Sequence, residues 1–276
     1  MRAVLREPRR AGRTIGLVPT MGSFHAGHLS LMRRAREDCH EVVVSLFVNP
    51  LQFNQAADLG RYPRDEATDV LLAAEAGVDY LFAPSQSEMY PPAFATTVSV
   101  AGITETLEGA HRGRGPFDGV ATVVTKLLHI VGPDVAYFGQ KDAQQALVIE
   151  RLVRDLDIPV RIEVCPTVRE EDGLALSSRN AHLSPEERNR ALALHRALES
   201  AAATVAAGER DAAKIAAAAR AQMASDGVDP EYFELVSADT LAPMVVIDED
   251  VLAVVAAQVG ATRLIDNQIM ATNGRV

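Results

Sequence analysis

The stretch TIGLVPTMGSFHAGH, residues 14–28, decides the fold of this chain of 276 residues. Its start, Thr14–Val18, is an apolar run typical of a buried strand, and a helical pattern runs from about Gly27 to Asp38. Gly22 and Gly27 remove side chains where a ligand must approach the main chain closely. A strand, a glycine-containing turn and a helix in this order indicate the phosphate-binding crevice of an α/β sheet.

The alternation of strands and helices continues along the chain. Glu41–Val48 is almost continuously apolar, as expected for a strand that is buried on both faces of a parallel sheet. Such alternation implies right-handed crossovers, so we predict an α/β fold with a Rossmann-like, doubly wound parallel sheet. Ligands then bind at the carboxyl ends of the strands. Further strands are expected near residues 78–83, 96–100, 134–138 and 159–164, and helices near residues 65–76, 119–131 and 142–157.

The composition changes after Leu183. Ser184, Pro185 and Glu187 form a helix start, with a serine cap, proline at the first helical position and glutamate three residues after the cap. Two alanine-rich helices and three short strands are expected beyond this point. We therefore predict two domains: a Rossmann-like catalytic domain over residues 1–183, and a smaller α+β domain over residues 184–276 that closes over it as a lid.

Composition and charge narrow the functional class. The chain has 37 acidic and 27 basic residues, a net charge of −10, which argues against partners such as nucleic acid or an anionic membrane. No stretch approaches the roughly 20 apolar residues of a membrane span. Two cysteines, Cys39 and Cys165, are too few for a disulfide framework and suit a reducing compartment. We therefore predict a cytoplasmic globular enzyme.

The candidate catalytic residues begin with His25 and His28, at the expected start of the first long helix. Two imidazoles at this position can donate hydrogen bonds to a polyphosphate, because a helix N-terminus attracts anions. Two other interpretations remain: a helix-capping turn with incidental histidines, and a zinc-binding pair. No cluster of cysteines or histidines elsewhere in the sequence completes a zinc site.

Three further segments place polar side chains at expected strand ends. Gln52 follows the Asn49-Pro50 turn, and its neutral amide can bind a hydroxyl or a carboxylate. Lys141 stands at a strand-to-helix junction, where its charge suits a phosphate, with Gln145 one turn further on. The loop Thr167–Asn180 carries the cluster Ser177, Ser178 and Arg179, which suits triphosphate binding. A solvated loop, a surface lysine and a linker turn are the ordinary alternatives for these segments.

Taken together, these motifs resemble the pantothenate synthetase (pantoate–β-alanine ligase) family, which belongs to the nucleotidylyl-transferase superfamily with the HxGH signature. The resemblance runs from Val18 to about Asn267. The motifs that carry it are PTMGSFHAGH, FVNPLQF, LEGAHRGRGPFDGVATVVTKLL, YFGQKDAQQ and LALSSRN. Their common order along one chain makes the resemblance far more specific than any single motif.

The resemblance implies a two-step reaction: pantoate attacks ATP to give pantoyl adenylate and pyrophosphate, and β-alanine then displaces AMP to give pantothenate. It implies Mg²⁺, a homodimer, and catalytic roles for His28, His25, Lys141 and Arg179. Gln52 and Gln145 would bind pantoate, with Gln52 also near β-alanine, and Asp69 would lie on the Mg²⁺ side. The implied ATP site comprises Met21, Gly22, Ser23, Phe24, His25, Ala26, Gly27, His28, Gly139, Gln140, Lys141, Asp142, Val168, Leu176, Ser177, Ser178 and Arg179.

Two alternative functions remain at this point. Another HxGH adenylyl- or cytidylyl-transferase acting on a phosphate ester would share the two histidines but would not need Gln52 or Gln145. A non-catalytic nucleotide-binding module would bind ATP without turnover, and it gives no reason for two histidines aimed at phosphates. Exchange of pyrophosphate into ATP that depends on pantoate separates the three.

Overall fold

The computed structural model describes residues 1–54 and 56–271, and it divides into two compact units. The first unit is Met1–Gln140 with Gln144–Pro166, and the second is Lys141–Ala143 with Thr167–Val276. The segment from Thr167 to Leu183, which the sequence assigned to the first domain, therefore groups with the second unit. The structural division falls before the change in composition, because that segment makes its contacts with the C-terminal elements.

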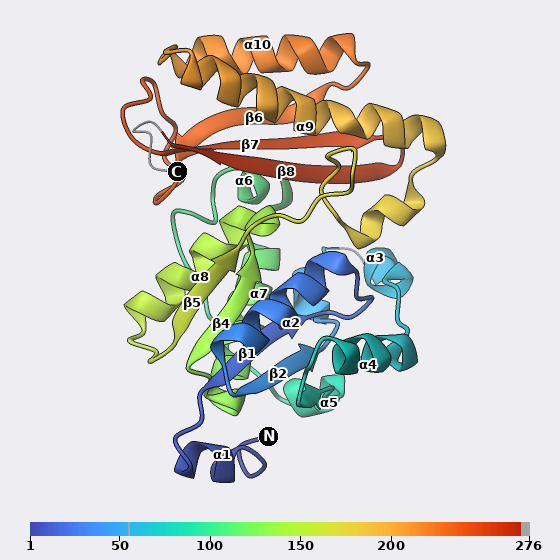
Figure 1. Cartoon of the computed structure of the whole chain (residues 1–276), viewed down its shortest axis with the longest axis vertical. Coiled ribbons are helices and arrows are strands. Elements are labelled where there is room, and N and C mark those ends of the chain that lie inside the picture. Colours follow the sequence, from blue (N-terminus) through green and yellow to red (C-terminus); the bar gives the residue numbers. More distant parts are fainter. Residues whose placement is uncertain (55, 272–276) are drawn as a thin grey trace. The chain divides into compact units, whose positions relative to one another are not determined.

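The first unit is built on a five-stranded sheet whose strand pairs are all parallel (Figure 1). The strand order is β3-β2-β1-β4-β5, so the chain moves outward from β1 in one direction and then from β4 in the other. This arrangement confirms the predicted doubly wound sheet, and its switch point lies between β1 and β4. The strands are β1 (Ile15–Thr20), β2 (Glu41–Leu46), β3 (Tyr80–Phe82), β4 (Val135–Gly139) and β5 (Arg161–Cys165).

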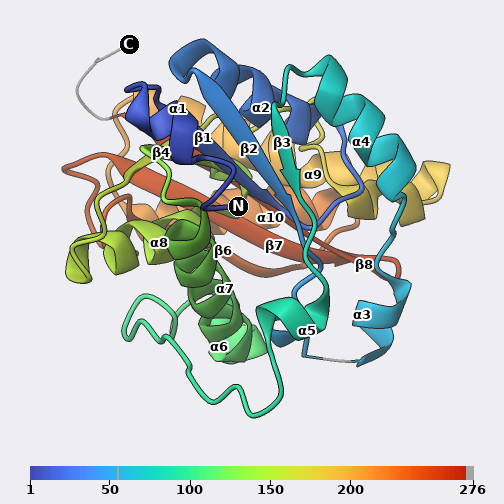
Figure 2. The same cartoon turned by 90° about the horizontal axis from the view of Figure 1, so that it is seen from below.

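Alternation along the strands creates a core on each face of this sheet. Val43 of β2 packs into one apolar cluster with helices α7 and α8, whereas Val42 and Val44 pack into another with α2 and α4. Figure 2 shows α2 and α4 on one face of the sheet and α7 on the other. The 3-10 turn η1 (Pro50–Gln52) lies in this unit, and η2 (Gln140–Asp142) begins in it; the first residue of α8 groups with the second unit, and the rest of that helix with this one. The helices are α1 (Arg6–Arg10), α2 (Ala26–Asp38), α3 (Ala56–Arg61), α4 (Glu66–Glu75), α5 (Gln86–Met89), α6 (Glu108–Arg112), α7 (Gly115–Val131) and α8 (Ala143–Asp155).

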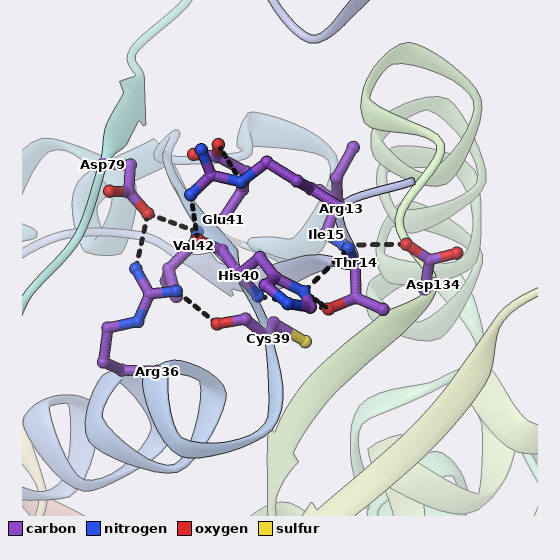
Figure 3. A network of polar contacts seen from close by, with 10 residues as sticks. All are labelled: Arg13, Thr14, Ile15, Arg36, Cys39, His40, Glu41, Val42, Asp79 and Asp134. Carbon is purple, nitrogen blue, oxygen red and sulfur yellow. Dashed lines mark hydrogen bonds and ion pairs between the residues drawn. The ribbon is translucent and has the colours of Figure 1, made fainter. Parts of the chain in front are cut away.

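Polar contacts hold the amino-terminal edge of the sheet (Figure 3). The Ile15 N–H donates to Asp134 Oδ2 at 2.7 Å, and the Val42 N–H donates to Asp79 Oδ2 at 2.8 Å. Asp79 also pairs with Arg36 of α2 at 2.7 Å. These side chains satisfy the first main-chain groups of the strands. The carboxyl ends lie at the opposite edge, and the loops that follow them carry the predicted site residues.

The second unit is an antiparallel sheet of order β6-β7-β8 with two helices on one face (Figure 1). Its core is one apolar cluster from both helices and all three strands. Ser184 and Glu187 form the predicted capping box at the start of the first helix. These features confirm the predicted α+β class. The elements are η3 (Ser178–His182), α9 (Pro185–Ala206), α10 (Ala212–Ser225), β6 (Pro230–Ser237), β7 (Val251–Val259) and β8 (Thr262–Met270).

One predicted strand is wrong. Residues 96–100 do not belong to a strand in the structure. Val98 donates its N–H to Thr122 Oγ1 of α7 at 2.9 Å, and the side chains of Val98 and Val100 pack against the core beneath that helix. A helix side chain thus takes the place of a neighbouring strand, which an apolar, β-branched pattern alone does not reveal.

Candidate active site

The side chain of Asp69 holds the turn that follows β1. This side chain is 2% exposed, and its two oxygens accept the N–H groups of Ser23 at 2.8 Å and of Phe24 at 2.7 Å. Gly22 has a φ of +87°, and a Cβ there would lie 2.9 Å from Asp69 Oδ2, so the turn requires glycine. The visible role of Asp69 is therefore to fix this turn, and its assignment to the Mg²⁺ side stays a prediction.

His25 and His28 are ordered by the start of α2, which they form. The Gly27 N–H donates to His25 Nδ1 at 3.1 Å, and the His25 N–H donates to His28 Nδ1 at 3.4 Å. A main-chain N–H can only donate, so both Nδ1 atoms accept, and each neutral ring carries its proton on Nε2. The ring centroids lie 4.2 Å apart. Two Nε2–H donors are thus grouped at the N-terminus of a 13-residue helix, a position that favours anions. The capping interpretation is confirmed, because Nδ1 of each ring accepts a main-chain N–H. Donation from Nε2 to a phosphate is compatible with it and stays a prediction.

Gln52, at the end of η1, is oriented by Asn49. The Asn49 side chain is 1% exposed, and its Nδ2 donates to Gln52 Oε1 and to the Gly119 carbonyl, each at 3.0 Å. The Tyr90 hydroxyl donates to Asn49 Oδ1 at 2.8 Å, and burial raises the pKa of Tyr90 to about 12, so this hydroxyl keeps its proton near neutral pH. Because the oxygen of Gln52 is engaged, its NH₂ group is the one suited to binding a hydroxyl or a carboxylate. Sequence reasoning used Asn49 only as a turn residue and missed this role.

The two glutamines after β4 have different surroundings. Gln144 is 7% exposed; its Nε2 donates to the carbonyls of Ile103 and Thr106, and its Oε1 accepts the Glu108 N–H. It therefore fixes the segment before α6. Gln145 is half-buried, and of these two neighbouring glutamines it is the one predicted to bind pantoate. Gly139 ends β4, beside β1, and Gln140 follows it directly.

The predicted ATP-site residues that follow Gln140 in the sequence lie in the second unit. Residues 168–176 form a short hairpin, in which the Leu176 N–H donates to the Val168 carbonyl at 3.0 Å. Ser177 then caps η3, its Oγ accepting the Arg179 N–H at 3.3 Å, and Arg179 is exposed. Lys141 lies 3.6 Å from the carboxylate of Asp142, which is half exposed. This unit thus combines the two predicted cations, Lys141 and Arg179, and the serine cluster.

Comparison with known proteins shows the family to which this chain belongs. The family model described as pantoate-beta-alanine ligase matches residues 1–269. The chain belongs to the pantoate-beta-alanine ligase family. It is 53% identical to the pantothenate synthetase of Cereibacter sphaeroides, over 97% of this chain and 95% of that one, and 54% identical to that of Moorella thermoacetica, over 96% and 94%.

Solved structures agree with this membership. The pantothenate synthetase of Thermus thermophilus is 48% identical and superposes with a TM-score of 0.90, covering 96% of each chain. The pantoate-beta-alanine ligase of Francisella tularensis, solved in complex with beta-gamma ATP and beta-alanine, is 35% identical, with a TM-score of 0.78, and the match covers 94% of this chain and 90% of that one. The family match includes both units, so the two alternative functions are set aside.

Within residues 1–54 and 56–271, no group of three or more His, Cys, Asp or Glu side chains could hold a metal ion. Mg²⁺ commonly binds through one or two carboxylates together with substrate phosphates, and the exposed Asp142 beside Lys141 fits that mode. None of the helices described is long and apolar enough to cross a membrane.

Proposed function

We propose that this chain condenses pantoate with β-alanine to pantothenate, through pantoyl adenylate, with release of AMP and pyrophosphate from ATP. The observation that carries the proposal is the pair of imidazoles at the start of α2. Both are held through Nδ1, so both direct an N–H donor from the N-terminus of that helix. Acyl adenylation needs such groups, because its chemistry depends on in-line positioning and on neutralising charge at phosphorus.

In the first step, the pantoate carboxylate attacks the α-phosphorus while the bond to pyrophosphate breaks. His25 and His28 donate from Nε2 to the phosphate oxygens as their charge grows, and His28 serves as the proton donor. Lys141 and Arg179 supply fixed positive charge for the leaving pyrophosphate. Gln52 and Gln145 hold pantoate by its hydroxyls and carboxylate. Mg²⁺ bound with the ATP phosphates, beside Asp142, would share the neutralisation of charge.

In the second step, the β-alanine amine attacks the activated acyl carbon and AMP leaves. The same donors that stabilised the adenylate hold AMP as it departs. Both steps are direct displacements between substrates, so no covalent bond to the protein forms. Gln52, oriented by Asn49, lies next to the reacting carbon in this scheme. We further propose that the chain acts in the cytoplasm as a homodimer. Light scattering of the purified protein tests the dimer, and fractionation of the cells tests the location.

Turnover with all three substrates tests the function. Purified protein supplied with ATP, pantoate and β-alanine is expected to form AMP and pantothenate in equal amounts. Without β-alanine, exchange of labelled pyrophosphate into ATP should require pantoate. Exchange driven by a phosphate ester, or AMP formed without pantothenate, would contradict the proposal.

A further inference from the structure

Two consecutive residues in the middle of β8 hold segments that are distant in sequence. Asn267 is 5% exposed, and its Nδ2 donates to the main-chain carbonyl of Lys141 at 2.9 Å. Asp266 is 4% exposed, and its two oxygens accept hydrogen bonds from the Arg169 guanidinium at 2.7 and 3.0 Å. All four residues belong to the second unit. An edge strand thus anchors both the turn that carries Lys141 and the hairpin that precedes Ser177–Arg179.

The position of β8 at the edge of its sheet explains how one strand can hold both segments. β8 is an edge strand, paired only with β7 within the described sheet. Consecutive side chains of a strand point to opposite faces, so Asp266 and Asn267 can reach partners on either side of the edge. The Asn267 N–H also donates to Asp266 Oδ1 at 2.8 Å, which joins the two contacts. The bidentate ion pair and the amide contact therefore form one buried network.

The contact on Lys141 is made to its main chain and does not engage the ammonium, which lies 3.6 Å from Asp142 Oδ1. A lysine is a point charge on a flexible four-carbon stem, so its placement depends on where its main chain is held. A buried amide that donates to that carbonyl supplies such a restraint. The side chain of Lys141 is 18% exposed, which limits its freedom further.

We propose that Asn267 is a positioning residue that fixes Lys141 for the phosphates of ATP. This inference rests on the proposed function, in which Lys141 contacts pyrophosphate. Asn267 does not itself touch substrate in this scheme. Removing the donor should move the ammonium, and a misplacement of about 1 Å can cost up to ~10²-fold in rate.

The experiment is a double-mutant cycle on the full chain. Asn267→Ala removes the donor, and Asn267→Asp keeps the shape but places an acceptor against the Lys141 carbonyl. Affinity for ATP with Mg²⁺ is measured by calorimetry without pantoate, so that no turnover is needed, and KM values are measured separately. We expect ATP affinity and KM for ATP to worsen about tenfold, more for Asp than for Ala, with KM for β-alanine unchanged. In the Lys141→Ala background, Asn267→Ala should have no further effect on ATP affinity.

The controls make the result decisive. Gln268→Ala, at the next position of β8, should leave ATP affinity unchanged, and thermal melting shows whether each variant folds. If Asn267→Ala does not fold, the nearly isosteric Asn267→Asp carries the same cycle. An undiminished effect of Asn267 substitution in the Lys141→Ala background, or no effect on ATP in the parent, overturns the positioning role. Failure of the parent chain to bind ATP would instead overturn the proposed function.

Discussion

At the scale of single residues, the helix cap at His25 and His28 constrains the chemistry that we propose for them. Each ring uses Nδ1 to accept a main-chain N–H of the α2 start, at 3.1 and 3.4 Å. The same bonds fix the tautomer, so the opposite nitrogen, Nε2, carries the proton. The helix cap therefore determines which hydrogen-bonding group each histidine can offer to a phosphate.

Substitution of His28 tests this division of roles. His28→Ala should fold but lose pantoate-dependent pyrophosphate exchange by ~10²-fold or more, as expected when a transition-state donor is removed. His28→Gln should retain more activity than His28→Asn, because the longer amide reaches the position of Nε2 and the shorter one only that of Nδ1. His129→Ala, on the exposed end of α7, is the control. Higher activity in His28→Asn than in His28→Gln would assign the essential role to Nδ1.

The sequence selects candidate ligand-binding residues, but it does not show which residues hold them in place. Motif spacing is enough to select His25, His28 and Gln52, because each stands next to a predicted strand end. Asp69 contacts Ser23, which lies 46 positions away in the sequence, and Asn49 contacts Gly119, which lies 70 positions away. Such pairs form only once the sheet has brought distant segments together, and no local pattern in a single sequence encodes them.

At the scale of elements, the contact of α7 with η1 decides where Gln52 lies. A Cβ on Gly119 would lie 2.4 Å from the Leu51 carbonyl oxygen and 2.8 Å from the Gln52 nitrogen. Nothing but glycine fits there without moving η1, since main-chain atoms cannot rotate away as a flexible side chain can. The main chain at Gln52 can therefore lie where it does only because Gly119 of α7 has no side chain.

Gly119→Ala should raise KM for pantoate and lower stability by about 1–3 kcal/mol, the usual cost of overpacking. Gly115→Ala lies in the same helix, and its Cβ would meet no atom within 4 Å, so it is the matched control. We expect that control to keep the parent KM for pantoate. Steady-state kinetics with thermal melting measures both effects, and an unchanged KM in Gly119→Ala would separate Gln52 from pantoate binding.

The start of α9 gives a pH-dependent prediction. Glu187 accepts the Ser184 N–H at 2.8 Å, and this bond, with that to the Ser184 hydroxyl, holds the pKa of Glu187 below its ordinary value. Its contribution to stability is therefore present above the unfolded-state pKa and is lost as pH falls through the folded-state pKa. Glu187→Gln should lower the melting temperature at about pH 7, and the difference from the parent should vanish in acid. Glu186→Gln, one position earlier, is the control; an equal loss there would indicate only a charge effect at the helix start.

At the scale of the whole molecule, the net charge of −10 opposes the approach of ATP, whereas in the proposed site the cations Lys141 and Arg179 favour its binding. Screening by dissolved salt decides which of these two effects is larger. The Debye length is about 8 Å at physiological ionic strength, so exposed charges farther than that from ATP contribute little. We therefore expect added sodium chloride, at fixed Mg²⁺, to raise KM for ATP. Lys141→Ala should flatten this dependence, since it removes one of the charges being screened. KM for zwitterionic β-alanine is the internal control. A KM for ATP that falls as salt is added would mean that the acidic surface as a whole, and not the local cations, governs how this chain meets its nucleotide.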